Sequence, residues 1–495
     1  MRYGSLAKGA TWSAAGRLFE LAVGLAAVAL VARWVGPAAY GVFSLSYVVV
    51  GLVEIVVSDG PGDALAQRRE LRGGHCNATL VGALAVALLG WAAIATGAAD
   101  IARWLGGGDA LAEILPLRAA ALPLAALAVV PGALLIRAQR LKALAGAGAV
   151  AGVLAGIVGI GAAWSGAGLW SLVAMELTRQ MVLTVLVLWL ARWRPGVRAS
   201  RRDASDLFGY NASTWGALGL GYANGQVPRL LIASTLGTEA LGLYALAERV
   251  YEQVFSLLMG PMYQVLMPAI ARVQSDREAV QRLAAAMMRV AASIASPLYL
   301  GLAAVAGLLV PMVFGDAWLA AVPVIQLMLL LGLRSSMWTV QMSVVRGMGR
   351  ADWHLGAAAL SLTLTVVLVN AALGYGLLAV TAAIVLRSVI MWVPYAWFVH
   401  RLTGLTASQQ SRAVAGPGLA ALAMAAITAG YVAWLGTSIP AAAALAAAVL
   451  LGATAYYALL PLFAPDAAAF VRSAIGVLAR RDLDALRKLF DGARG

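Results

Sequence analysis

Apolar residues occur along this chain in long runs, separated by short segments that are polar, glycine-containing or rich in arginine. An α-helix needs about 20 predominantly apolar residues to cross a bilayer. By that measure the chain is predicted to contain fourteen spans, near 10–34, 40–64, 77–98, 114–136, 143–164, 168–191, 207–232, 239–270, 285–313, 320–345, 354–373, 376–399, 414–435 and 440–463. The pattern predicts an all-α polytopic membrane protein of about 14 transmembrane helices.

Positive charges alternate between the two ends of the predicted spans. With the N-terminus in the cytoplasm, most of the 36 Lys and Arg residues fall in cytoplasmic segments such as 192–202 and 272–282, and the opposite loops hold almost none. Cytoplasmic loops of membrane proteins carry this excess. Both termini are therefore expected in the cytoplasm. The alternation also supports the span count, because one missed helix would invert every later loop.

Composition narrows the class of protein further. The chain is 62% hydrophobic and 12% charged, whereas soluble domains are about 25% charged. The net charge of +14 would indicate a nucleic-acid partner in a soluble protein, but positive cytoplasmic loops account for it here, and no nucleic acid is expected. Cys76 is the only cysteine, so no intrachain disulfide and no metal site is expected.

Two stretches about 200 residues apart are similar. Residues 32–46, ARWVGPAAYGVFSLS, match residues 233–247, ASTLGTEALGLYALA, at five of fifteen positions. Each stretch joins two consecutive spans on the outer side. Gly36 and Gly237 are predicted to form the turns, and Gly41 and Gly242 are predicted to allow close helix approach.

A second pair of segments, about 208 residues apart, extends the repeat. RAQRLKALAGAG followed by GAGLWSLV resembles RGMGRADWHLGA followed by GYGLLAV. The repeat predicts two six-helix lobes, 1–203 and 204–408, related by a pseudo-two-fold axis along the membrane normal. Residues 409–464 would add two transmembrane helices. Residues 465–495 are expected to form an amphipathic tail on the cytoplasmic membrane surface, because apolar residues recur there at helical spacing among cations.

Several segments resemble the polysaccharide or oligosaccharide flippases of the MOP (multidrug, oligosaccharidyl-lipid, polysaccharide) exporter superfamily, in particular the lipopolysaccharide and exopolysaccharide export branch. The resemblance is carried by LVARWVGPAAYGVFSLS, IRAQRLKALAGAGAV, GAGLWSLVAME and VFGDAWLAAVPVIQLM, and it covers residues 10–350, with weaker likeness to about residue 400. It implies two six-span lobes around a V-shaped central cavity.

The resemblance also implies a function. The chain would be a flippase that moves a polyprenyl-pyrophosphate-linked oligosaccharide from the cytoplasmic to the periplasmic leaflet of the bacterial inner membrane by alternating access. It would act in the synthesis of O-antigen, capsule or exopolysaccharide and would not be an enzyme. Expected partners are the lipid-linked oligosaccharide, membrane lipids and, transiently, a glycan polymerase or glycosyltransferases. We expect a monomer without cofactors, driven by a coupling ion (Na⁺ or H⁺) or by the membrane potential.

Arginines within or at the edges of the spans are the candidates for phosphate contacts. They are Arg17, Arg33, Arg118, Arg179, Arg229, Arg249, Arg289, Arg334 and Arg387. At a lipid-facing bilayer centre each would cost about 2.5–3.5 kcal/mol, so they must pair, reach the interface or line water. Spacing predicts structural pairs between Arg17 and Glu20 and between Glu176 and Arg179. The arginines expected to extend from helix ends to the interface are Arg33, Arg118, Arg229 and Arg289.

The site prediction combines these charges with the resemblance, which implies that the first, second, seventh and eighth spans surround the cavity. Arg17 and Arg249 are predicted to contact the pyrophosphate, with Arg334 and Arg387 as second choices, because a guanidinium binds two phosphate oxygens at once. The carboxylates predicted to tune these arginines or to bind a coupling cation are Glu20, Glu54, Glu248 and Glu252.

Two other functions remain open from the sequence. One is cation-coupled multidrug extrusion within the same superfamily, against which the excess of arginine argues. The other is a membrane glycan polymerase or transferase, which would need catalytic bases, metal-binding carboxylates or large loops. The outer loops here are short and contain no D-x-D motif, and no H-E-x-x-H motif is present.

Overall fold

The computed structural model describes residues 3–68, 71–194, 201–435 and 439–469, with Gly196 and Arg472; within 3–23, 201–218 and at a few single positions it describes the backbone only. Every regular element in these ranges is a helix, which confirms the all-α prediction. The chain divides into two compact units, Met1–Ala245 (unit 1) and Leu246–Gly495 (unit 2). The predicted tail at 465–495 falls mostly outside the described residues.

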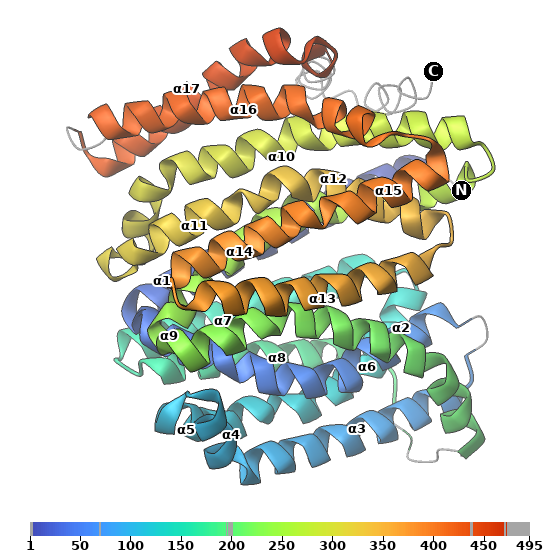
Figure 1. The fold of residues 1–495 in the computed structure, drawn as a ribbon. Coiled ribbons are helices and arrows are strands. Elements are labelled where there is room, and N and C mark those ends of the chain that lie inside the picture. Colours follow the sequence, from blue (N-terminus) through green and yellow to red (C-terminus); the bar gives the residue numbers. More distant parts are fainter. Residues whose placement is uncertain are drawn as a thin grey trace. The chain divides into compact units, whose positions relative to one another are not determined.

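Unit 1 is a bundle in which α7 packs along α1 and α8, and α6 packs against α3 and α8 (Figure 1). Its elements are α1 (Tyr3–Glu54), the π-helical turn η1 (Ile55–Asp59), α2 (Gly60–Gln67), α3 (Gly73–Thr96), α4 (Ala98–Leu105), α5 (Gly108–Ala119), α6 (Ala121–Arg137), α7 (Leu141–Trp164), α8 (Leu169–Ala191) and the first part of α9 (Arg201–Arg272). Small and aliphatic side chains such as Leu135, Ala147 and Val187 fill its core.

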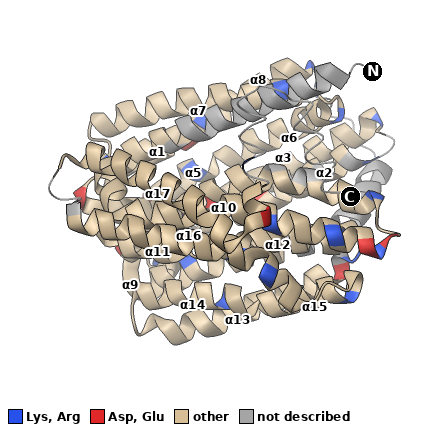
Figure 2. Cartoon of the chain, turned by 90° about the horizontal axis from the view of Figure 1, so that it is seen from above, with Lys and Arg blue, Asp and Glu red and all other residues tan. Residues whose placement is uncertain are grey.

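Unit 2 is built around α10, which packs against α11, α12 and α16. Its elements after α9 are α10 (Arg277–Phe314), the 3₁₀ turn η2 (Asp316–Ala321), α11 (Val322–Leu329), α12 (Leu331–Gly347), α13 (Ala351–Leu373), α14 (Leu377–Ile390), α15 (Trp392–Thr403), α16 (Ala407–Leu435) and α17 (Ala441–Phe463). Charges are few along these helices: α17 has none and α16 has only Arg412, as the tan ribbon in Figure 2 shows. Leu300 packs against Ala421 and Met424, which joins the two extra helices to the unit.

Twelve helical stretches in the described residues are long and apolar enough to cross a membrane. Two of them, Ala26–Ala66 and Gly219–Gly260, contain the glycines at which the sequence places an outer turn. The count of fourteen spans, the pseudo-two-fold axis and the lobe boundaries at 203 and 408 stay predictions.

The two repeated glycines adopt the same backbone conformation. Gly36 interrupts α1 with φ 77° and ψ 168°, and Gly237 interrupts α9 with φ 86° and ψ 174°. A positive φ of this size is accessible to glycine and rarely to other residues. The predicted turns are therefore confirmed as breaks in the helix at both positions.

The second glycine of each repeated stretch allows a close approach within unit 1. A methyl group at Gly41 would overlap the carbonyl oxygen of Thr238, and one at Gly242 would overlap the carbonyl oxygen of Pro37. The two breaks therefore bring α1 and α9 into backbone contact, which confirms the role predicted for these glycines. The short repeated motif has a packing role, because the glycine of each copy leaves room for a backbone carbonyl group of the other copy.

Replacing Gly41 by alanine is expected to destabilise unit 1 by about 1–3 kcal/mol, because the added methyl group would force two backbones apart. The thermal midpoint of the purified protein in detergent measures the effect. Gly82→Ala is the matched control, since Gly82 lies in α3 with no heavy atom within 4 Å of the added carbon. Equal midpoints for the two variants would contradict the close approach.

Candidate functional site

A cluster of charges lies within unit 1, formed by the buried Arg118 and Glu176, the half-buried Tyr47 and the exposed Arg179 (the unit-1 cluster). Arg179 holds Glu176 with two hydrogen bonds, 2.8 Å from Nη2 to Oε1 and 3.3 Å from Nε to Oε2. The Tyr47 hydroxyl donates to Glu176 Oε2 at 3.3 Å. The guanidinium carbon of Arg118 stacks 4.5 Å from the centre of the Tyr47 ring. The predicted pair between Glu176 and Arg179 is confirmed.

Glu176 balances the positive charge of this cluster. Glu176 is only 8% exposed and Arg118 only 2%, so neither charge is well hydrated. Glu176 attracts both Arg118 and Arg179 electrostatically, and Glu54 adds a weaker attraction to each. A buried charge is tolerated when it is paired in this way. The unit-1 cluster is therefore a largely neutralised network that ties α1 and α5 to α8.

The prediction that Arg118 reaches the membrane interface from a helix end is wrong. The helical stretch that carries it runs from Gly108 to Arg137 and begins six residues before the predicted span. Arg118 therefore lies well inside the stretch, at the end of α5, and it is buried against Tyr47. Pro116 lies just before the break between α5 and α6, and it is the sequence feature that marks where Arg118 lies in the stretch.

A second cluster lies within unit 2, formed by Arg334, Arg387, Tyr251, Tyr299 and Tyr395 (the unit-2 cluster). Arg334 on α12 has its guanidinium carbon 5.9 Å from the centre of the Tyr395 ring. The rings of Tyr251 and Tyr299 lie 5.7 Å apart. Arg387 on α14 donates to Thr365 Oγ1 at 2.9 Å. Both arginines are half-buried and lie near the middle of the apolar stretches Asp316–Gly347 and Leu377–Thr403.

The unit-2 cluster holds two arginines, and the carboxylate of Glu252 on α9 acts electrostatically on its Tyr251. The groups that act on Arg334 electrostatically are the two tyrosines Tyr395 and Tyr251 and the like charge of Arg387. The Nε and Nη2 atoms of Arg334 are buried without a hydrogen-bond partner among the described residues. Two guanidinium groups near one another at this depth favour an anion, because an anion would offset both the repulsion and the loss of hydration.

The internal repeat explains why the two clusters differ. Gly168 and Gly376 both have positive φ and both cap the N-terminus of the following helix, α8 or α14. A shift of 208 residues, which aligns these glycines, also aligns Arg179 with Arg387 and Glu176 with Ile384. The second copy thus keeps the arginine and replaces its carboxylate by an apolar residue.

Arg249, the first choice of the sequence-based site prediction in this unit, is exposed on α9. Its Nε and Nη2 atoms each lie 3.1 Å from the amide oxygen of Gln253, in the amide orientation that satisfies both groups. Glu252 is exposed beside it and Glu248 is half-buried. This side of α9 is polar, and the roles predicted for Arg249, Glu248 and Glu252 stay predictions.

The remaining predicted site residues lie in unit 1. Glu54 is half-buried at the end of α1, within electrostatic reach of Arg118 and Arg179. Arg17 and Glu20 fall in the N-terminal part of α1, whose side chains lie outside the described residues. Among the described residues, no group of three or more His, Cys, Asp or Glu side chains could hold a metal ion.

Comparison with known proteins identifies the family. Residues 30–323, more than half of the chain, match the family described as polysaccharide biosynthesis protein. The chain belongs to this family. The chain is 27% identical over 359 residues, 70% of each chain, to the lipopolysaccharide biosynthesis protein WzxC of Escherichia coli strain K12. It is 24% identical over 321 residues, 64% of each chain, to the succinoglycan biosynthesis transport protein ExoT of Rhizobium meliloti strain 1021.

Solved membrane transporters share the fold of this chain. The lipid II flippase MurJ, in an inward closed conformation, superposes with a TM-score of 0.76 at 12% identity and covers 92% of this chain and 99% of its own. A multidrug resistance MATE family transporter of the MOP superfamily reaches 0.59 at 15% identity, over 78% of this chain and 98% of its own. The polysaccharide biosynthesis protein is therefore a multi-pass membrane protein with the MOP fold, as the sequence resemblance predicted.

Proposed function

We propose that this polysaccharide biosynthesis protein is a flippase that moves a polyprenyl-pyrophosphate-linked oligosaccharide from the cytoplasmic to the periplasmic leaflet of the bacterial inner membrane. The proposal is supported by the family, by relatives named for lipopolysaccharide biosynthesis and succinoglycan transport, and by the fold shared with a lipid II flippase. The lipid-linked oligosaccharide supplies surface polysaccharide synthesis, and alternating access carries it across.

The observation that carries the proposal at residue level is the pair of arginines, Arg334 and Arg387, near the middle of membrane-spanning helices of unit 2. A lipid-linked glycan has an anionic pyrophosphate, a polar sugar head and an apolar tail. The tail can stay in lipid while the head crosses. Arg334 and Arg387 would hold the pyrophosphate, because guanidinium groups bind phosphate oxygens in pairs and stay charged at depth.

The other residues of the site have supporting roles in this proposal. The half-buried ring of Tyr251 beside the arginines provides a flat surface with a polar edge, which suits a sugar ring. The buried ring of Tyr395 supports Arg334 from below its guanidinium group. Arg17 and Arg249 would contact the pyrophosphate at other stages of transport. The carboxylates Glu20, Glu54, Glu248 and Glu252 would tune these arginines or bind a coupling Na⁺ or H⁺.

Depletion of the protein in its host tests the function. Surface polysaccharide should be lost, and lipid-linked oligosaccharide should accumulate in a form that a membrane-impermeant oxidant cannot reach in intact spheroplasts. A glycosyltransferase mutant, which makes no lipid-linked oligosaccharide, is the control. Accumulation of oxidant-accessible oligosaccharide on the outer face would show that the protein acts in a step that follows translocation. That result would contradict the proposal.

A further inference from the structure

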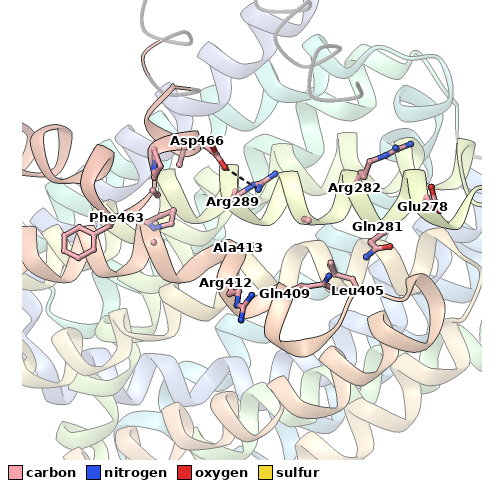
Figure 3. Close-up of a pocket in the computed structure, with 16 residues that line it drawn as sticks. Glu278, Gln281, Arg282, Arg289, Leu405, Gln409, Arg412, Ala413, Phe463 and Asp466 are labelled. Atoms are coloured by element: carbon pink, nitrogen blue, oxygen red, sulfur yellow. Dashed lines mark ion pairs between the residues drawn. The ribbon is translucent and has the colours of Figure 1, made fainter.

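A cavity of about 610 Å³ lies within unit 2, away from the unit-2 cluster, between the first turns of α10 and α16 and the segment that follows α17. Figure 3 shows Arg282 and Arg289 on α10, Arg412 and Gln409 on α16, and Phe463 and Asp466 from the α17 end. Its volume is in the range of small-ligand sites, about 300–1,000 Å³. Neither the family nor the proposed transport site accounts for it.

The cavity combines cations with an apolar wall. Arg282, Arg289 and Arg412 are all exposed. Arg289 Nη1 lies 4.0 Å from Asp466 Oδ2, and Glu278, one helical turn before Arg282, also lines the cavity, so its three arginines outnumber its two carboxylates. A distance of that length between exposed groups adds little stability. Ala413, Pro417 and Phe463 form the apolar wall. Beyond it, Leu462 is 76% exposed at the end of α17.

The position of the cavity along the helices places it at the membrane surface. α10 has 38 residues, so it is about 57 Å long at 1.5 Å per residue, against a hydrocarbon core of about 30 Å. Arg282 and Arg289 lie in the first half of this helix and Arg412 lies near the start of α16, close to the segments 272–282 and 401–412 that the arginine distribution predicts to be cytoplasmic. Arginines here would meet lipid headgroups while the apolar wall faces acyl chains.

We infer that this cavity binds the phosphate headgroup of an anionic phospholipid from the cytoplasmic leaflet, with Arg282, Arg289 and Arg412 on the phosphate and the wall at Phe463 along the first acyl carbons. Basic pockets between transmembrane helices on this side recognise such headgroups. The C-terminal residues 473–495 are a poor alternative occupant, because they carry five Lys and Arg against three Asp residues and would be repelled. The lipid would clamp α16 and α17 to α10.

Native mass spectrometry of the full-length protein tests the inference with phosphatidylglycerol and phosphatidylcholine as probes. The native protein should retain phosphatidylglycerol preferentially. The variant Arg282→Gln, Arg289→Gln, Arg412→Gln should lose about 30-fold in affinity for it, the scale of losing two or three cationic contacts to an anionic surface. Because the three side chains are exposed, an unchanged thermal midpoint without added lipid is expected and excludes misfolding as the cause.

A charge-matched control separates this pocket from general surface attraction. The variant Arg192→Gln, Arg194→Gln, Arg272→Gln removes three exposed arginines outside the cavity and should bind phosphatidylglycerol as the native protein does. Equal losses in both triple variants, or no loss in the cavity variant, would overturn the inference. Displacement of phosphatidylglycerol by millimolar inorganic phosphate would also overturn it, since it would assign the cavity to a free anion. Lipid binding is measured without glycan transport. A failure of the proposed transport function would therefore not change the lipid-binding result, and the two proposals can be tested independently.

Discussion

Replacing Arg334 and Arg387 together by alanine is expected to lower glycan export about 100-fold or more while the protein still inserts into the membrane. Each arginine would contribute charge-assisted hydrogen bonds to the pyrophosphate, worth about 1.5–3 kcal/mol apiece. Because both lie near mid-membrane, water cannot replace them there at low cost. Surface polysaccharide measured by immunoblot, normalised to the amount of protein in the membrane, gives the loss.

Lysine replacements refine this prediction. Arg334→Lys and Arg387→Lys keep the charge and lose the planar fork, so each is expected to restore export only in part. Arg272→Gln, an exposed arginine at the end of α9, is the control and should export normally. Full export by the double alanine variant would show that neither arginine is needed to bind the substrate.

The internal repeat offers a sharper test of the same charges. Ile384→Glu would recreate beside Arg387 the carboxylate that Glu176 provides beside Arg179 in unit 1. The new ion pair should neutralise Arg387 and reduce export, whereas Ile384→Gln, of equal size and no charge, should reduce it much less. Equal export by the two variants would show that the charge of Arg387 does not act on the substrate.

Replacing Glu176 by glutamine is expected to destabilise unit 1 by about 3–5 kcal/mol, the usual cost of removing one partner of a buried ion pair. Arg118 would then remain buried, and Arg179 at the edge of the cluster, without their common carboxylate. The expected result is a large drop in folded yield and in the thermal midpoint of the purified protein in detergent.

Two further variants control the Glu176 prediction. Glu113→Gln changes an exposed glutamate on α5 of the same unit and should alter stability by about 0.5 kcal/mol or less. The pair Glu176→Gln with Arg118→Met removes the deeply buried cation and should recover part of the loss, since Arg179 is less buried. A Glu176→Gln protein as stable as Glu113→Gln would contradict the structural role of the unit-1 cluster.

Much of the fold was predictable because two strong local signals determine it. Long apolar runs define the helices, since backbone groups in lipid must be hydrogen-bonded internally. Gly36 and Gly237 mark their breaks, because few other residues adopt that backbone conformation. The spacing of Glu176 and Arg179 was also sufficient to predict their ion pair, since residues three apart on a helix share a face.

The candidate site was less predictable because it depends on contacts between distant helices. Tyr47 meets Arg118 and Glu176, and Tyr395 meets Arg334, across separations that no local pattern reports. The burial of Arg118 escaped sequence reasoning because a helix boundary was placed six residues late. The internal repeat held the signal that could have distinguished the two clusters, because Ile384 stands in the second copy where Glu176 stands in the first.

The most direct test of the central claim is transport by the purified protein in vesicles that contain a polyprenyl-pyrophosphate oligosaccharide in both leaflets. An impermeant oxidant added outside consumes the outer-leaflet glycan and leaves the inner pool protected. With the native protein, under an imposed ion gradient and membrane potential, the protected pool should be consumed as well, and with the double alanine variant at Arg334 and Arg387 it should persist. A protected pool that survives in vesicles with the native protein, or disappears equally with the variant, would contradict the account.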